Sequence, residues 1–311
     1  MNVKHLLLVM TVLSLAGCAR NSQTSKPLPT ATLIPSPIPT PTSAFKKFGA
    51  AELDVTYCTP NDVPQQMDIY YPTSGGPWPV LLYAHGGGWS EGDKAEGVGW
   101  HPMTEHGFLV VSVNYRLASY ENKFPVMIED VKCAVRYLRA HASQYNLDAD
   151  HIGAVGASAG GHLVALLGLA DEAAGWDTGE YSEQSSRVQA VVTLAGPSDF
   201  TRGDYDSATM AIYYAFDEMP GSPSEKLVAA SPVTYISPED PPFLIIHGDK
   251  DSIVPVEQAY VLGEQLKNAG VPSELVIVRN GSHSIDGENI SPTEEEISNL
   301  IIAFLEKYLK E

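Results

Sequence analysis

GASAG at residues 156–160 directly follows a short, mostly apolar run at residues 151–155. Gly-x-Ser-x-Gly after a buried strand is typical of a nucleophile elbow, in which a serine sits on a sharp turn from strand to helix. The small residues are a steric requirement, because neighbouring parts of the chain approach such a strained turn closely. The stretch therefore predicts that Ser158 stands at the carboxyl edge of a parallel sheet, with the Ala159 amide facing a developing oxyanion.

A second glycine-rich stretch, HGGGW at residues 85–89, also follows an apolar run, residues 80–84. Glycines let backbone amides approach an oxyanion without interference from a Cβ atom. Gly87 and Gly88 are therefore predicted to complete an oxyanion hole with Ala159. Together the two stretches predict ester hydrolysis by an activated serine. Three side chains are predicted to line the substrate pocket: His85, Trp89 and Tyr115.

A serine nucleophile requires a base within hydrogen-bond reach, and the base is itself oriented by a carboxylate. In the fold that carries such elbows, the acid and then the histidine follow the nucleophile along the chain. His283 lies in a loop after the last strand-like run and before the last helix, which is where the base is expected. Three competing histidines are predicted to be structural or pocket-lining: His85, His162 and His247.

The acid is predicted from the stretch HGDKDSIVP at residues 247–255, which follows the seventh strand-like run. Asp251 is preferred, because its loop faces the same edge of the sheet as the serine. Asp249 in the same loop is predicted to brace the turn, as Asp commonly does. Asp199, after the sixth strand-like run, remains an alternative acid.

Eight strand-like runs occur along the folded part, at residues 53–57, 67–71, 80–84, 108–114, 151–155, 188–194, 243–247 and 274–278. The first two mix or alternate polar and apolar residues, as antiparallel edge strands do. The later ones are nearly continuous Val, Ile, Leu and Ala, as expected for parallel strands covered on both faces. Helical patterns separate most of the later runs. This order of strands and helices predicts an α/β architecture, with a mostly parallel eight-stranded sheet covered by helices on both faces.

Helical patterns also mark where helices begin and end. Residues 125–145 carry an apolar face, and residues 256–269 are followed by Gly270, a typical C-cap. The last helix is predicted to open with a capping box at residues 291–294, with Pro292 at its first position.

Residues 197–241 break the alternation and form an insertion after the sixth strand-like run. Two interpretations stay open. The segment forms a small cap that lines an acyl or alcohol pocket, or it is a surface helix whose large side chains pack inward. These side chains are Tyr205, Tyr213, Tyr214, Phe216 and Met219.

The first 44 residues have the features of targeting and spacing. Lys4 precedes an apolar stretch, residues 6–15, which is too short to span a bilayer. LAGC at residues 15–18 resembles the lipobox of bacterial lipoproteins. It predicts a lipoprotein signal peptide at residues 1–17 and lipidation of Cys18, with a plain secretory signal as the alternative. Residues 18–44 are predicted to be the lipidated cysteine and a Pro/Thr/Ser-rich linker, which leaves residues 45–311 as the catalytic domain.

The net charge of −19 and the lack of a basic cluster argue against nucleic acid as a partner. An acidic surface also disfavours anionic substrates, so neutral esters are expected. The chain has no Cys-x-x-Cys or His-Glu-x-x-His stretch, so neither a metal site nor a cofactor is predicted. Cys58 and Cys133 are predicted to be free buried thiols, because cysteine is commonly a core residue, with a disulfide between them, which export permits, as the alternative.

Several stretches together resemble the α/β-hydrolase esterases over about residues 50–311. They are HGGGW at 85–89, NYRL at 114–117, the helix start at 124–130, SAGGH at 158–162 and HGDKD at 247–251. The resemblance is strongest to the bacterial BD-FAE-like group, near the hormone-sensitive-lipase-like carboxylesterases. Ala157 stands where the latter usually carry Asp, which favours the BD-FAE-like group. The resemblance implies acetylated or feruloylated plant polysaccharide, or generic short esters, as substrates.

The prediction is therefore a lipid-anchored, extracytoplasmic carboxylesterase that works without a cofactor and is held at the membrane through Cys18. One alternative is an arylformamidase-type hydrolase, which uses the same kind of glycine-rich loop on an amide-like bond. Predicted export argues against it, because that metabolism is intracellular. The other is a non-catalytic hydrolase-fold binding protein at the cell surface, against which the full set of serine, acid and histidine argues.

Overall fold

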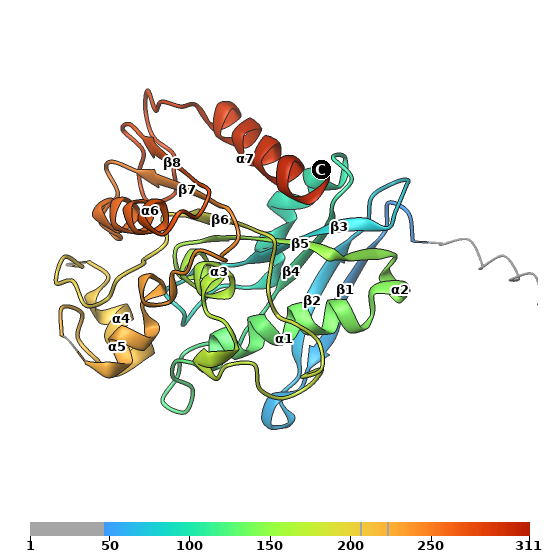
Figure 1. Ribbon diagram of the computed structural model, residues 1–311, viewed down its shortest axis with the longest axis horizontal. Coiled ribbons are helices and arrows are strands. Elements are labelled where there is room, and N and C mark those ends of the chain that lie inside the picture. The colour runs from blue at the N-terminus through green and yellow to red at the C-terminus, as the bar shows by residue number, and fades with distance from the viewer. Residues whose placement is uncertain (1–46, 206, 223) are drawn as a thin grey trace, which may run out of the picture. The chain divides into compact units, whose positions relative to one another are not determined.

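The eight strand-like runs form one sheet, with the strands in the order β1-β2-β4-β3-β5-β6-β7-β8 (Figure 1). The computed structural model describes residues 47–311 except Asp206 and Pro223, and residues 45–311 form one compact unit. The predicted signal peptide, Cys18 and most of the linker therefore lie outside the described residues. The strands are β1 (Ala51–Cys58), β2 (Gln65–Tyr70), β3 (Trp78–Ala84), β4 (Leu109–Val113), β5 (Leu147–Ala157), β6 (Ala190–Leu194), β7 (Phe243–Gly248) and β8 (Ser273–Val278).

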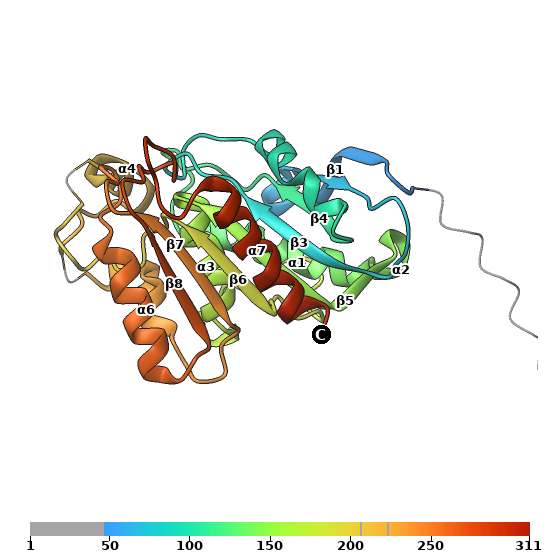
Figure 2. The ribbon, with the colours of Figure 1, turned by 90° about the horizontal axis from the view of Figure 1, so that it is seen from above.

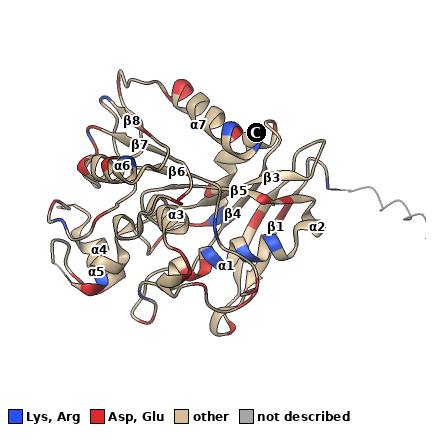
Figure 3. Ribbon diagram, viewed as in Figure 1, with Lys and Arg blue, Asp and Glu red and all other residues tan. Residues whose placement is uncertain are grey.

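The direction of the strands follows the polarity pattern of the sequence. β1 pairs antiparallel with β2, and β2 pairs antiparallel with β4, whereas all the remaining neighbours are parallel. β3, β4, β6 and β7 carry no charged residue (Figure 3), which suits strands buried on both faces. The predicted α/β architecture, with two early antiparallel strands and a parallel remainder, is confirmed, but only β1 of those two is an edge strand, because β2 lies between β1 and β4.

Helices cover both faces of the sheet. The α-helices are α1 (Val126–Ala140), α2 (Ala142–Tyr145), α3 (Ala159–Leu169), α4 (Thr209–Phe216), α5 (Glu225–Ala230), α6 (Glu257–Ala269) and α7 (Glu294–Leu309). The described residues also include four 3₁₀ segments: η1 (Pro60–Asp62), η2 (Lys94–Thr104), η3 (Glu172–Ala174) and η4 (Pro232–Tyr235). Buried residues of α1, α3 and α6 share one hydrophobic cluster, and those of α7 and η2 share the other. Figure 2 shows α7 lying across one face of the sheet. No helix in the described ranges is long and apolar enough to cross a membrane.

The ends of two helices test the predicted caps. α6 is followed by Gly270 at a φ of 83°, so the predicted C-cap is confirmed. The predicted start of α7 was wrong by two residues, because Thr293 is the N-cap and forms the capping box with Glu296. Ser291 is unavailable as a cap, since its backbone pairs with Arg279 in an isolated β-bridge.

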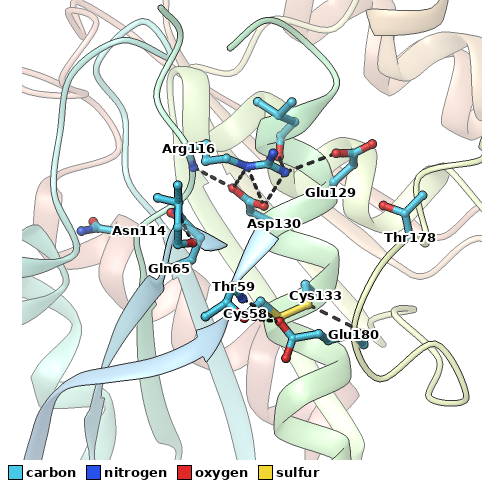
Figure 4. Close-up of polar contacts among 12 residues, drawn as sticks. Cys58, Thr59, Gln65, Asn114, Arg116, Glu129, Asp130, Cys133, Thr178 and Glu180 are labelled. Atoms are coloured by element: carbon cyan, nitrogen blue, oxygen red, sulfur yellow. Dashed lines mark hydrogen bonds and ion pairs between the residues drawn. A yellow bond between two sulfur atoms is a disulfide. The ribbon is translucent and has the colours of Figure 1, made fainter. Parts of the chain in front are cut away.

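The predicted free thiols were also wrong, because Cys58 and Cys133 form a disulfide with their Cα atoms 6.5 Å apart (Figure 4). Cys133 lies on the buried face of α1, as the apolar pattern indicated. That face packs against β1, and Cys58 is the last residue of β1. The disulfide therefore joins the edge strand to the first long helix.

Candidate active site

Ser158 occupies the turn between the end of β5 and the start of α3. Its backbone adopts φ 54° and ψ −118°, a conformation that is costly for a residue with a side chain and common at functional sites. Its amide donates a hydrogen bond to the Leu194 carbonyl at 2.8 Å, which holds the turn against β6. A Cβ atom at Gly160 would lie 2.0 Å from the Ala84 carbonyl oxygen, so only glycine allows α3 to begin beside the end of β3. The turn therefore has the geometry that the sequence predicts for an elbow.

Three side chains from three separate loops meet at this turn. The His283 Nε2 atom lies 2.9 Å from the Ser158 hydroxyl, and its Nδ1 atom lies 2.7 Å from the Asp251 Oδ2 atom. The side chain of Asp251 is fully buried, and that of His283 is 20% exposed. The serine, imidazole and carboxylate thus form a continuous hydrogen-bonded line, with the imidazole at the edge of solvent.

The other two aspartates considered in the sequence analysis, Asp199 and Asp249, have other hydrogen-bond partners. Asp199 accepts hydrogen bonds from the amide and the hydroxyl of Thr201, at 3.0 and 2.6 Å, so its carboxylate closes its own turn. Asp249 accepts a hydrogen bond from the Asn280 amide at 2.7 Å. That bond joins the loop after β7 to the loop after β8, in agreement with the predicted bracing role. Asp251 is the aspartate that contacts the imidazole.

His247 contributes to the site in a way that the sequence did not reveal. Its buried Nε2 atom lies 3.1 Å from Asp251 Oδ2 and 2.9 Å from the Val254 carbonyl, so it donates toward both oxygens. Asp251 Oδ1 also accepts from the amides of Ile253 and Val254, at 2.8 and 2.9 Å. The spacing of four residues between His247 and Asp251, at the end of a strand, was the one sign in the sequence that these two side chains could meet.

These contacts govern the charge of Asp251. Burial alone would raise the pKa of this carboxyl group. The hydrogen bonds from His247, His283 and the amides of Ile253 and Val254 outweigh burial and hold the pKa of Asp251 well below its usual range. The carboxylate is therefore anionic at neutral pH and held in one orientation toward the imidazole.

The HGGGW loop lies against the elbow. A Cβ atom at Gly86 would be 3.5 Å from the Ser158 Cβ atom, which places this loop directly beside the serine. Gly87 has a φ of 98°, and a Cβ atom there would lie 2.2 Å from the Glu91 carbonyl oxygen, so the turn requires glycine. The loop that carries Gly87 and Gly88 therefore adjoins the serine, as an oxyanion loop must.

The three side chains predicted to line the pocket are instead buried beneath the loop: His85, Trp89 and Tyr115. The ring of Tyr115 stacks on His85 at a centroid distance of 4.3 Å, and its hydroxyl donates to the His85 carbonyl at 2.9 Å. Burial lowers the pKa of His85. The prediction missed this arrangement because His85 and Trp89 turn from the loop into the interior, where Tyr115 from the segment after β4 supports the loop backbone.

Trp89 belongs to a buried hydrogen-bonded chain. Its indole N–H donates to His162 Nδ1 at 3.1 Å, and His162 Nε2 donates to the Ala230 carbonyl at 2.8 Å. Burial lowers the pKa of His162 to about 4, against a smaller opposing effect of the bond to Ala230. The imidazole is therefore neutral and links the oxyanion loop, α3 and the insertion.

The large side chains of the insertion divide into buried and exposed ones. Phe216 packs inward against Trp89 at 5.1 Å between ring centroids, and Tyr205 is buried against Phe200. Tyr213 and Tyr214 of α4 point outward instead. α4 also adjoins the oxyanion loop, because a Cβ atom at Gly88 would lie 3.3 Å from the Ala211 Cβ atom.

Within the part of the chain that the structure describes, no group of three or more His, Cys, Asp or Glu side chains is placed to hold a metal ion. At Ser158 an imidazole contacts the hydroxyl, a carboxylate contacts that imidazole, and a glycine-rich loop lies beside the serine. These are the groups used for acyl transfer through a serine nucleophile.

The sheet order, the elbow and the likeness to solved structures define the protein as an α/β-hydrolase. It resembles the structure described as a truncated form of carbohydrate esterase from gut microbiota, with a TM-score of 0.72 and 27% identity. The alignment covers 85% of this chain and 98% of that one.

Within that class, residues 67–266 match the model of the BD-FAE family, and the chain belongs to that family. It is 38% identical over 197 residues to the probable carboxylic ester hydrolase LipM of Mycobacterium tuberculosis (strain ATCC 25618 / H37Rv), covering 61% of this chain. It is 30% identical over 256 residues to the esterase LipC of the same strain, covering 76% of this chain. The aligned parts span 45% of LipM and 62% of LipC.

Proposed function

We propose that this chain is a serine carboxylic-ester hydrolase. The observation that carries the proposal is the hydrogen-bonded line from the Ser158 hydroxyl through His283 to Asp251, with distances of 2.9 and 2.7 Å. Membership of the BD-FAE family and the similarity to esterases support it.

The reaction uses each group in turn. The Ser158 oxygen attacks the ester carbonyl carbon while His283 Nε2 takes the hydroxyl proton. Backbone amides of Gly87, Gly88 and Ala159 stabilise the negative oxygen of the tetrahedral intermediate. His283 then gives the proton to the departing alcohol, which leaves an acyl-serine.

Hydrolysis of the acyl-serine repeats the same steps with water. His283 removes a proton from the water as it attacks, and returns that proton to Ser158 when the carboxylic acid leaves. Asp251 remains an anion throughout and stabilises the imidazolium that forms in both halves of the reaction.

The proposed substrates are short-acyl or aryl esters, and in particular acetyl or feruloyl esters of plant polysaccharide. The similarity to a structure described as a carbohydrate esterase supports this class. So does the net charge of −19, which favours a neutral ester over an anionic one. Acetylated xylan, methyl ferulate and p-nitrophenyl esters of increasing chain length form the panel that identifies the acyl group.

Labelling by a fluorophosphonate tests the enzyme itself. The wild-type protein should form an adduct on Ser158, and Ser158→Ala should form none. A folded wild-type protein without an adduct would refute the proposal and favour a non-catalytic binding protein of the same fold. Hydrolysis of N-formyl aryl amides in preference to all esters would favour the arylformamidase alternative.

The cellular position is proposed from the sequence alone. We infer that Cys18 carries the lipid that anchors the protein outside the cytoplasm. Cys18→Ala should move the protein from the membrane fraction to the released fraction. Unchanged fractionation of this variant would remove the lipoprotein proposal.

A further inference from the structure

Four large side chains stand exposed on one part of the surface, and we name them the tyrosine platform: Tyr120, Met210, Tyr213 and Tyr214. Tyr120 is 94% exposed, Met210 68%, Tyr213 45% and Tyr214 38%. A cluster of exposed aromatic side chains is costly in water and commonly marks a binding surface. The mechanism proposed above uses none of these residues.

One half of the tyrosine platform is a face of α4. Met210, Tyr213 and Tyr214 have i, i+3 and i+4 spacing, so their side chains share one side of the helix. The other side is buried and carries Ile212 and Phe216. α4 adjoins the oxyanion loop, with 3.3 Å between the Ala211 Cβ atom and a Cβ position at Gly88, so the helix that carries this face lies next to the loop beside Ser158.

The other half, Tyr120, stands on a segment that contacts the same loop independently of α4. The amide of Ala118 donates to the Trp89 carbonyl at 2.8 Å, which ties the segment carrying Tyr120 to the HGGGW loop. The Phe124 amide donates to the Ala215 carbonyl at 3.0 Å, which ties the same segment to α4. The rings of Tyr120 and Tyr214 meet edge to face, with 6.4 Å between their centroids. Tyr120 and Tyr214, which are 94 residues apart in the sequence, therefore meet on one surface, formed by two segments that both contact the oxyanion loop.

The charges near the tyrosine platform indicate what it binds. The Lys123 ammonium lies 4.5 Å from the centre of the Tyr214 ring and pairs with Asp217 at 3.2 Å, so its charge is compensated. Glu121, next to Tyr120, is exposed, and the whole chain has a net charge of −19. An anionic ligand or an anionic membrane surface is thus disfavoured. Tyrosine presents an apolar ring face together with a polar hydroxyl, which suits a neutral ligand with both kinds of surface.

We propose that the tyrosine platform binds a pyranose ring of the glycan that carries the ester, next to the reacting carbonyl group. The C–H face of the sugar packs on the tyrosine rings, and its hydroxyl groups reach the phenol oxygens and solvent. Tyr120, the most exposed ring, is the principal contact, and Tyr214 extends the surface toward the oxyanion loop. This inference rests on the proposed esterase function and specifies the part of the substrate beyond the acyl group.

The test compares a glycan ester with an ester that has no sugar. For Tyr120→Ala combined with Tyr214→Ala, kcat/KM on acetylated xylooligosaccharides should fall about tenfold further than kcat/KM on p-nitrophenyl acetate, since the loss of aromatic contacts has that size. The matched control is Tyr260→Ala, which removes a 47% exposed tyrosine from α6, outside the tyrosine platform. It should leave the ratio of the two constants unchanged.

The outcomes separate the two proposals. If the wild-type protein hydrolyses neither substrate, the esterase function fails. If the wild-type protein hydrolyses p-nitrophenyl acetate alone, the esterase function stands and the glycan-binding role of the tyrosine platform is wrong. The same conclusion follows if the double variant leaves the ratio of the two kcat/KM values unchanged. Binding provides a second readout. Ser158→Ala protein should be retarded in a gel containing acetylated xylan, and the two tyrosine substitutions should abolish the retardation.

Discussion

His162 should make the folded state less stable as the pH falls from 6.5 toward 4. The side chain lies fully buried in α3, one turn after Ser158. Nδ1 accepts a hydrogen bond from the Trp89 indole and Nε2 donates to the Ala230 carbonyl, so both ring nitrogens are occupied in the neutral form. A second proton would place an N–H against another N–H in the interior.

The magnitude follows from the pKa. Burial lowers the pKa of His162 from 6.5 in the unfolded chain to about 4 in the folded one. The unfolded state therefore takes up the proton first as the pH falls, and the contribution of His162 to stability, complete above pH 6.5, is lost through this window. At ~1.36 kcal/mol per pH unit, the full loss is about 3.4 kcal/mol, of which about 2 kcal/mol is gone at pH 5.

The assay is urea denaturation of the wild-type protein and of His162→Gln at pH 8 and pH 5. Glutamine can accept from the Trp89 indole and donate to the Ala230 carbonyl, but it does not titrate. The variant should be the less stable protein at pH 8, because the ring contact with Phe200 at 5.1 Å is lost. The difference between the two free energies of unfolding should shrink by about 2 kcal/mol at pH 5.

The comparison isolates His162, because all carboxyl groups titrate in both proteins. A difference that stays constant within about 0.5 kcal/mol from pH 8 to pH 5 would refute the reasoning. It would mean that the pKa of the His162 imidazole is the same in the folded and the unfolded state.

Three further predictions concern the acid Asp251, its second histidine partner His247 and the disulfide. Asp251→Asn should lower kcat on p-nitrophenyl acetate by about four orders of magnitude, whereas Asp199→Asn should stay within about threefold of wild type; the reverse order would exchange their roles. His247→Phe should lower kcat about tenfold with little change in KM, because Asp251 loses one donor. An unchanged kcat would leave His247 with a packing role only. Replacing Cys58 and Cys133 by Ser should lower the free energy of unfolding by about 4 kcal/mol in urea denaturation, given their separation of 75 residues. A loss below about 1 kcal/mol would contradict that estimate.

The sheet was predictable because its information is local. Parallel strands covered on both faces need continuous apolar runs, and the two antiparallel strands mix or alternate polar and apolar residues, so each strand can be recognised from a few residues. The elbow was predictable for a similar reason, since the small residues around Ser158 reflect contacts with the chain immediately beside it.

The choice between Asp199 and Asp251 as the acid, unlike the strands and the elbow, could not be made from a local pattern. The two residues follow β6 and β7, which are neighbours in the sheet, so their loops lie at the same edge. Strand order alone therefore does not discriminate between them. The decision depends on the distance from each carboxylate to the His283 imidazole, which no local pattern encodes.

The errors share the same origin. The burial of Cys133 was visible in the helical pattern of α1, but its pairing with Cys58 depends on β1 packing against that helix across a long stretch of chain. Ser291 has the residue type of a cap, yet its backbone is engaged with Arg279. Trp89 combines a φ of 61°, which is uncommon for a residue with a side chain, with a ring buried against His162 and Phe216, and no local pattern in the sequence indicates either feature.

The hydrogen-bonded chain from Trp89 through His162 to the Ala230 carbonyl has a consequence for how substrates gain entry. It connects the loop beside the serine, the helix that starts at the serine and the segment after the sixth strand through buried contacts. A hinged opening of that segment would have to break the bond to Ala230 and leave a buried imidazole N–H without a partner, at a cost of about 1–3 kcal/mol. The bond to Ala230 therefore makes an opened form of this segment the minor state, and weakening that bond is expected to increase its population.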